Sequence, residues 1–374
     1  PWAERTGFIL SDLYLKDGER CRLDPRRLMQ DACTRLAEQG YIFIAGIEIE
    51  AHIFKVTDPK TALRDCTQPS TPPDVEAFRH GFQHLSDTAV DGLDGILTKL
   101  RRAIRAVGLP LRTLEVEWGP GQVEITLDPI TGVAAADAAV LLRSTIKQTC
   151  QRLGLLATFM ARPGLPNVFS CGWHLHQSLS TIVDETNCFA SPDDVLSPTG
   201  RHYVGGLLRH ARAGTAFTNP TINGYKRLNG TPLSPKRATW SVDNKGAMLR
   251  VMGGAGDPTV HIENRIGDPA ANPYLCFAAL LMAGLDGIKN KIDPGEAMDK
   301  NLYDLPAEEL ADIPTVCGSL REALECLAED HDFLLQGDVF TKDQIEGYID
   351  LKMEEVETYE HTPHPVEYQM YYSC

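Results

Sequence analysis

The stretch Ile47-Glu48-Ile49-Glu50 alternates apolar and acidic residues, a period of two that is typical of a β-strand with one polar and one apolar face. Residues two positions apart on a strand lie about 6.5–7 Å apart on the same side. The stretch therefore points two carboxylates the same way. The pattern recurs in Leu114-Glu115-Val116-Glu117, Val123-Glu124-Ile125, Trp173-His174-Leu175-His176 and His261-Ile262-Glu263.

A sheet face with this many carboxylates would repel itself, and hard divalent cations between the acids would remove that repulsion. The candidate ligands are Glu48, Glu50, Glu117, Glu124, His174 and Glu263. Carboxylates suit Mg²⁺ or Mn²⁺, and the imidazole favours Mn²⁺ or a Mg²⁺ site that tolerates nitrogen. Any single Glu-x-Glu is more often a solvent-facing pair on an edge strand. Its repetition on several strands favours a metal-dependent enzyme over a simple binding module.

Polar and basic residues accompany these candidate ligands. His176 and Ser178 follow His174 on the same face of their predicted strand, so we expect them to point into the same cavity. Arginine forks match carboxylate and phosphate geometry, and a metal cluster rimmed by cations suits transfer of a γ-phosphoryl group to a carboxylate. The cations considered are Lys226, Arg227, Lys245, Arg250 and Arg265. The alternative for each is a surface charge paired with one of the abundant acids. No Walker-type or dinucleotide-binding glycine motif is present, so metals and cations would hold the phosphates.

The composition excludes several classes of protein. The 374 residues carry a net charge of −15, which argues against nonspecific nucleic-acid binding. The cysteines form no CxxC pair, and we expect free thiols in a reducing cytoplasm. The longest apolar run, 273–288, is interrupted by Asp286 and is too short to span a bilayer, so no membrane partner is expected.

The order of the predicted elements favours one large α+β domain. Helices are expected at 24–40, 87–107, 135–153, 200–214 and 269–288, and an acidic, mostly helical tail at 305–358. Residues 56–75 and 217–251 are rich in loop-forming residues and are expected to be long loops. We therefore predict a curved antiparallel β-sheet with a polar active-site face, surrounded by helices.

Together these motifs resemble the catalytic domain of the glutamine synthetase family. The similar segments, in the family's order, are GIEIEAHIF, EVEWGPGQVEI, GWHLHQSL, NPTINGYKRL, RATWSVDNKGAMLRV and HIENRIGDPAANPYL, and the match runs from about residue 1 to 290. The resemblance implies an ATP-dependent ligase that phosphorylates the γ-carboxylate of L-glutamate and then joins it to an amine.

The resemblance also implies roles for single residues. Glu50, Glu117 and Glu124 would hold one Mg²⁺ or Mn²⁺ ion, and Glu48, His174 and Glu263 the ion on the nucleotide side. Arg227 and Arg265 would bind the substrate carboxylate and the transferring phosphoryl group, and His176, Ser178 and Arg250 the ATP phosphates. Lys245 stands where the family usually has an arginine, so it keeps the charge and loses the fork.

Departures from the family pattern bear on the amine. The family's ammonium-binding glutamate falls on or beside Leu233, and no acid lies between Arg227 and Asp243. A buried ammonium without a carboxylate partner is costly, so an apolar residue favours an amine with a hydrocarbon body. Trp173 would add a second bulky apolar group at the substrate site. Further departures are the Phe169-Ser170-Cys171-Gly172 segment and His261, which replaces a common nucleotide-contacting arginine.

We therefore hypothesise a γ-glutamyl amide ligase for an organic monoamine, alkyl or aromatic, within the branch that makes polyamine, alkylamide and anilide products. The alternatives are a true glutamine synthetase using ammonia and a catalytically inactive structural relative, which should have lost metal ligands. A guanidino kinase fits the motifs poorly. Residues 1–374 would form the catalytic domain, with the family's upstream β-grasp domain apparently absent from this chain. The resemblance also implies a homo-oligomeric ring, commonly a dodecamer.

Overall fold

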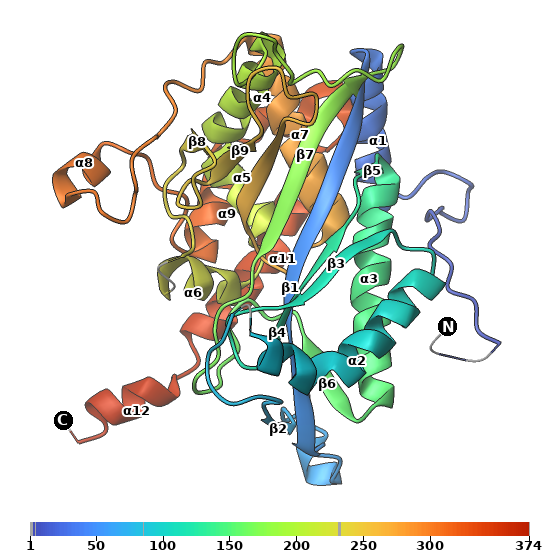
Figure 1. Cartoon of the computed structure of the whole chain (residues 1–374), viewed down its shortest axis with the longest axis vertical. Helices are drawn as coiled ribbons and strands as arrows, with labels where there is room; N and C mark the ends of the chain where they lie inside the picture. Colours follow the sequence, from blue (N-terminus) through green and yellow to red (C-terminus); the bar gives the residue numbers. More distant parts are fainter. Residues whose placement is uncertain (1–2, 4, 85, 231–232, 374) are drawn as a thin grey trace.

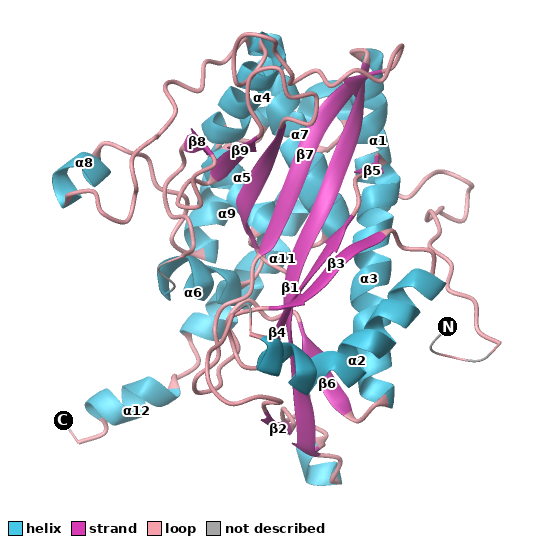
Figure 2. Ribbon diagram, in the orientation of Figure 1, coloured by secondary structure: helices cyan, strands magenta, loops and turns pink. Residues whose placement is uncertain are grey.

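A single long strand, β1 (Tyr41–Asp58), organises the fold of this computed structural model, which describes residues 3, 5–84, 86–230 and 233–373. Strand β1 runs through a ten-stranded, mostly antiparallel sheet with the order β3-β4-β1-β7-β10-β9-β8 (Figure 2). Strands β2, β5 and β6 lie off this path, and each of them also pairs with β1. The other strands are β2 (Asp74–Glu76), β3 (Leu111–Val116), β4 (Gln122–Leu127), β5 (Ile130–Thr131), β6 (Leu155–Thr158), β7 (Trp173–Thr181), β8 (Trp240–Val242), β9 (Leu249–Met252) and β10 (His261–Gly267).

Helices cover one face of this sheet, as Figure 1 shows for α1, α3 and α7. Helix α7 is buried over nearly its whole length because it packs against α1, α3, α4 and α5. The helices are α1 (Pro25–Glu38), α2 (Asp87–Ala106), α3 (Val133–Arg152), α4 (Pro198–Arg209), α5 (Ala211–Thr218), α6 (Ile222–Gly230), α7 (Pro273–Asn290), α8 (Ala307–Ala311), α9 (Leu320–Glu329), α10 (Asp332–Leu335), α11 (Lys342–Glu360) and α12 (Pro365–Tyr371), with short 3₁₀ turns η1 (Leu63–Asp65) and η2 (Gln336–Asp338).

Alternation along the strands separates the core from the polar face. On β1 the side chains of Phe43, Ala45, Ile47 and Ile49 are buried. They join the large apolar cluster that the helices complete. Glu48 and the other polar residues of alternate parity are left on the opposite face. The predicted α+β class is therefore confirmed.

Most predicted helices are found near their expected positions, but one predicted loop region is more ordered than expected. Asp24 caps α1 by accepting a hydrogen bond from the Arg26 N–H, and Pro25 opens the helix. The prediction that 217–251 is made of long loops was wrong, because this segment contains α6, β8 and β9. Strands β8 and β9 are only three and four residues long, and the turn-forming residues between them dominate the local composition, so the composition did not reveal their pairing.

The cysteines and the apolar helices bear on two further expectations, free thiols and the lack of a membrane span. Every cysteine among the described residues is a free thiol. The described residues include no helix that is both long and apolar enough to cross a membrane.

Candidate active site

The register of the strands gathers the predicted acids on one face of the sheet. Glu50 on β1 is paired with Glu124 on β4, and Glu124 is paired with Glu115 on β3. Glu117 follows the end of β3, and Glu48 lies two residues before Glu50 on the same strand. All of these acids line one cavity of about 380 Å³, which we call the carboxylate cavity.

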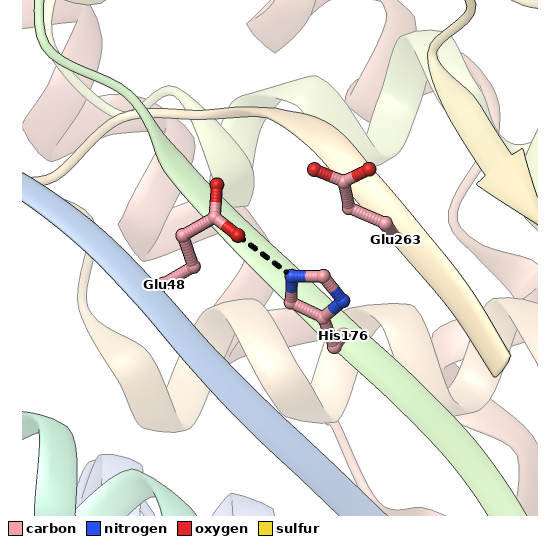
Figure 3. Close-up of side chains that lie close together, drawn as sticks. All are labelled: Glu48, His176 and Glu263. Carbon is pink, nitrogen blue, oxygen red and sulfur yellow. Dashed lines mark hydrogen bonds and ion pairs between the residues drawn. The ribbon is translucent and has the colours of Figure 1, made fainter. Parts of the chain in front are cut away.

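A second group of ligand-type side chains spans β1, β7 and β10 (Figure 3). Glu48, His176 and Glu263 each offer a ligand atom, and these atoms all lie within 4.8 Å of one another. The His176 Nε2 lies 3.0 Å from a Glu48 oxygen, and the His174 Nδ1 lies 3.3 Å from a Glu263 oxygen. His174 also makes a short hydrogen bond to Glu48. Either histidine could therefore complete a cation site with Glu48 and Glu263.

Cations surround Glu263, which is almost completely buried. Arg265 donates a short hydrogen bond to one carboxylate oxygen, and Arg250 lies 3.3 Å from the other. Arg227 is also buried, and its guanidinium donates to the β10 carbonyls of Arg265, Ile266 and Gly267 at 3.1–3.2 Å. Lys245 is exposed and lines the carboxylate cavity with these three arginines. Four of the five predicted basic residues thus line the same cavity as the acids. Lys226 does not, and its ammonium lies 4.8 Å from the centre of the Tyr359 ring.

Backbone and amide groups hold Glu50 in place. The Gln122 side-chain amide donates to a Glu50 oxygen at 2.9 Å and to the Ser170 carbonyl at 3.0 Å. The Gly172 N–H donates to the same Glu50 oxygen, also at 2.9 Å. Gln122 is 1% exposed, so its amide is fixed by packing as well as by hydrogen bonds. This is an arrangement that orients one oxygen of a candidate ligand.

The electrostatics of the cavity fit divalent cations. Burial, together with the charges of Glu48, Glu50 and Glu117, raises the pKa of Glu124 to about 9. Burial also raises the pKa of Glu50, despite the opposing charges of His174 and Arg227. Carboxylates that repel one another in a buried site are neutralised either by protons or by cations. Oxygen-rich ligands with one or two imidazoles suit Mg²⁺ or Mn²⁺.

A larger cavity of about 790 Å³ adjoins the carboxylate cavity, with which it shares Glu48, Glu115 and Glu124. His176 and Ser178 line this larger cavity, whereas Arg250 lines the carboxylate cavity. His261, which also lines the larger cavity, lies 3.1 Å from His176. The two cavities therefore meet at the carboxylates of β1 and β4.

The prediction that Trp173 contacts substrate was wrong. Trp173 is 1% exposed and packs in the core against Phe277 of α7. The Arg143 guanidinium lies 5.0 Å from the centre of its ring. His174 and Trp173 are consecutive on β7, so they point to opposite faces of the sheet. The alternation in the sequence already contained this information.

Leu233 lies where substrate could reach it, since it is 60% exposed and lines the carboxylate cavity. Three aromatic residues that the sequence analysis did not propose as site residues line the same cavity, namely Trp118, Phe169 and Tyr303. Glu115 and Gln122 were also missed. Glu115 stands in the alternating stretch that predicted Glu117, whereas no local pattern marks the aromatic residues, which come from separate loops.

Comparison with known proteins agrees with this geometry. The model for the catalytic domain of glutamine synthetase matches residues 22–371. Gamma-glutamylanilide synthase from an Acinetobacter species is 43% identical over 91% of this chain and 68% of its own length. Glutamine synthetase from Azorhizobium caulinodans is 46% identical over 100% of this chain and 82% of its own length. A solved structure of a GmaS/ADP complex superposes with a TM-score of 0.83 and 27% identity, covering 97% of this chain and 80% of that one.

The fold, the paired cavities and these relatives define an ATP-dependent ligase. The chain belongs to the glutamine synthetase family. The family uses ATP, divalent metals, glutamate and an amine or ammonia. The relatives divide between an anilide synthase and glutamine synthetases at similar identity, so family membership alone does not identify the amine.

Proposed function

We propose that this enzyme joins the γ-carboxylate of L-glutamate to an organic amine, with a γ-glutamyl phosphate intermediate. ATP would occupy the larger cavity and glutamate the carboxylate cavity. Two observations support this assignment: the larger cavity has a suitable volume for a nucleotide, and the two cavities meet at the candidate metal ligands. That junction is where a γ-phosphoryl group would meet a γ-carboxylate.

Two divalent cations fit the donor set. Glu50, Glu117 and Glu124 would hold one ion, and Glu48, His174 and Glu263 the other, with His176 also within reach of Glu48. When bound, such ions neutralise the charge of the phosphates and the carboxylates. Gln122 and the Gly172 N–H would keep Glu50 oriented throughout.

The arginines would act on the charge that develops during transfer. Arg265 and Arg250 line the cavity beside Glu263, and Lys245 adds an exposed charge to the same cavity. The γ-phosphoryl group would pass to a glutamate oxygen as ADP leaves, and the amine nitrogen would then attack the γ-carbon and expel phosphate. Preformed cations stabilise the added negative charge at each step. Arg227, locked onto the β10 carbonyls, would position the bound carboxylate.

One observation supports an organic amine in particular. The carboxylate cavity is also lined by Leu233, Trp118, Phe169 and Tyr303. Leu233, Trp118 and Tyr303 keep 60%, 44% and 47% of their surface exposed. Apolar and aromatic groups favour an amine with a hydrocarbon body, alkyl or aromatic, and they supply no carboxylate to pair with an ammonium charge. The segment between Arg227 and Asp243 supplies no carboxylate.

The alternative, a true glutamine synthetase, has support from relatives of that name at 40–46% identity. Testing aniline, ethylamine, putrescine and ammonium as amine substrates separates the two proposals. The rate is measured as phosphate release that depends on ATP and glutamate, and mass spectrometry identifies the product. We expect a monoamine to exceed ammonium in kcat/KM by at least about tenfold, equivalent to 1.4 kcal/mol. The highest kcat/KM with ammonium would reject the organic-amine proposal.

We also propose that residues 1–374 form one catalytic domain that assembles into a homo-oligomeric ring in the cytoplasm. Helix α12 projects from the body (Figure 1), and Tyr368, Met370, Tyr371 and Tyr372 around it are 58–78% exposed. Such an apolar arm fits burial against a second copy. Light scattering of the full chain and of a variant ending at residue 361 tests this, since we expect the truncation to lower the oligomer mass. An unchanged mass would contradict a role for the arm.

A further inference from the structure

A third cavity, of about 650 Å³, lies outside the catalytic centre, between α3, β6 and the start of α6. Among the described residues, none that lines it also lines either catalytic cavity. We call it the rear cavity, because Arg143 at its wall packs on Trp173, on the core side of the catalytic sheet. Neither the proposed reaction nor its metals use this space.

The feature that distinguishes the rear cavity is the guanidinium of Arg143. Its Nε and Nη2 atoms are both buried, and neither has a hydrogen-bond partner among the described residues. Burial lowers the pKa of Arg143 to about 10, and the charge of Asp268 opposes this only in part. The Trp173 ring covers one face of the guanidinium, but a ring face does not satisfy N–H groups. A buried charge in this state is destabilising unless something pairs with it.

The surroundings of Arg143 indicate what could pair with it. Ser144 and Lys147 lie within one helical turn on α3, and both line the rear cavity. Lys147 is exposed and marks the side open to solvent. Much of the remaining wall is apolar, with Val140, Leu156, Phe159, Met160 and Pro269 among its residues.

The geometry of the free nitrogens limits the chemistry of the ligand. Nε and Nη2 form one edge of the guanidinium, and two parallel N–H groups on that edge match the two oxygens of a carboxylate. Both nitrogens are covered in this structure, so the Arg143 side chain, which lines the cavity, must turn this edge toward the cavity when a ligand binds. A phosphate would also accept these bonds, but it would leave the apolar wall without a partner. A carboxylate with a hydrocarbon body would satisfy both parts of the cavity.

We propose that the rear cavity is a second ligand site, which binds a small monocarboxylate with an apolar body. The carboxylate pairs with the Arg143 guanidinium after its Nε–Nη2 edge turns toward the cavity, and Lys147 adds a charge on the solvent side. The hydrocarbon body packs on Val140, Leu156 and Phe159. This site is independent of the identity of the amine substrate.

Benzoate is a suitable probe, with inorganic phosphate and chloride as comparison anions at matched ionic strength. We expect benzoate to raise the Tm of the full chain saturably and to give a binding isotherm by calorimetry, because a ligand that binds only the folded state stabilises it. Chloride should give no saturable rise, and phosphate a weaker one. Saturable binding of phosphate without binding of benzoate would overturn the assignment of the ligand class.

The variant R143M isolates the contribution of the guanidinium. It should weaken benzoate binding at least tenfold, yet it should be no less stable than the parent without ligand, because it removes an unpaired buried charge. R152Q changes an exposed arginine of the same helix that does not line the rear cavity, and it should bind benzoate as the parent does. Undiminished benzoate binding by R143M, or no saturable binding by the parent, would overturn the proposal.

Discussion

Glycine 172 shows how one missing side chain can shape the catalytic centre. A Cβ at this position would lie 2.5 Å from the Nη2 of Arg227 and 3.2 Å from the Nε2 of His174. Both contacts are closer than real Cβ atoms tolerate with ease. The Gly172 N–H also holds Glu50. The residue therefore lets an arginine, an imidazole and a carboxylate approach the same point.

Gly172→Ala should displace Arg227 and lower kcat/KM by about 10–100-fold, because a shift of about 1 Å at a catalytic site has costs of that order. Gly164→Ala is the matched control, since a Cβ there meets nothing within 4 Å. Steady-state kinetics with the preferred amine measures both variants. Equal kcat/KM for G172A and G164A would show that Arg227 does not need this space.

Leu233→Glu should alter the choice of amine. A carboxylate at this position of the carboxylate cavity would pair with ammonium. Binding of aniline would instead bury that charge against an aromatic ring without a partner, which is costly. We expect the ratio of kcat/KM for ammonium to that for aniline to rise at least about tenfold, which is 1.4 kcal/mol of discrimination. Leu63→Glu, at a 92% exposed position outside both catalytic cavities, should leave the ratio unchanged. A ratio that L233E does not move would separate Leu233 from amine selection.

At the scale of elements, helices α4 and α7 depend on close backbone contact. A Cβ on Gly206 of α4 would lie 2.1 Å from the Ala283 carbonyl oxygen and 2.8 Å from the backbone of Gly287. These are rigid backbone atoms, so the helices would have to separate. Helix α7 supports the core face of the sheet, and its position depends on this contact.

Gly206→Ala should therefore destabilise the protein by about 3 kcal/mol, as overpacking a tight core does. Gly95→Ala, at an exposed position of helix α2 with nothing within 4 Å of a new Cβ, should stabilise the protein by about 0.5–1 kcal/mol. Thermal unfolding followed by circular dichroism compares the pair. If G206A unfolded at the same temperature as the parent, the close α4–α7 contact would not be needed.

His210 links three helical segments through two carboxylates. It lies between α4 and α5, and its ring nitrogens lie 2.9 Å from Asp286 of α7 and 2.8 Å from Asp330. The ring also stacks on Phe333. Burial alone would lower the pKa of His210, but the bonds to Asp330 and Asp286 outweigh it and raise the pKa above its usual value.

A raised pKa in the folded state makes His210 stabilising at low pH. Its contribution is fully present below the unfolded pKa of about 6.5 and is lost as the pH rises through the folded pKa. We therefore expect the Tm to fall between pH 6 and 8.5 more steeply in the parent than in H210Q, with Mg²⁺ present throughout. H361Q, at an exposed histidine, should keep the parent's slope. Identical slopes in H210Q and the parent would exclude this role.

At the scale of the whole molecule, cations on the sheet should stabilise the fold. The acids of β1, β3 and β4 converge on one cavity, and their mutual repulsion opposes folding until it is neutralised. A ligand at 100 times its Kd adds about 2.7 kcal/mol of stability. Millimolar MnCl₂ should therefore raise the Tm, and excess EDTA should reverse the rise.

E124Q should reduce the response to manganese, because Glu124 lies between the other acids of the cavity. E354Q, at an exposed position on α11, should respond as the parent does. Differential scanning fluorimetry measures all of these shifts. The same Tm in manganese and in EDTA would remove the basis for a metal site at this sheet.

Much of this organisation was predictable from local sequence. The alternating stretches predicted β1, β3, β4, β7 and β10, because strand geometry repeats every two residues and a half-buried strand must follow it. The signals for α1 and α2 also predicted their positions closely. Applied strictly, the same alternation would have placed Trp173 with the core.

The sequence by itself determined which residues are strand acids, which are strand histidines and which face each shares, since these follow from backbone periodicity. Only the tertiary structure decided that Glu48, His176 and Glu263 meet, that Gly172 makes room for Arg227, and that Leu233 shares a wall with residues from distant loops. It alone revealed that two buried nitrogens of Arg143 have no hydrogen-bond partner in the part of the chain that the structure describes. The physical reason is that strand order and loop approach depend on how the whole core packs, and packing between distant segments leaves no periodic trace in the chain.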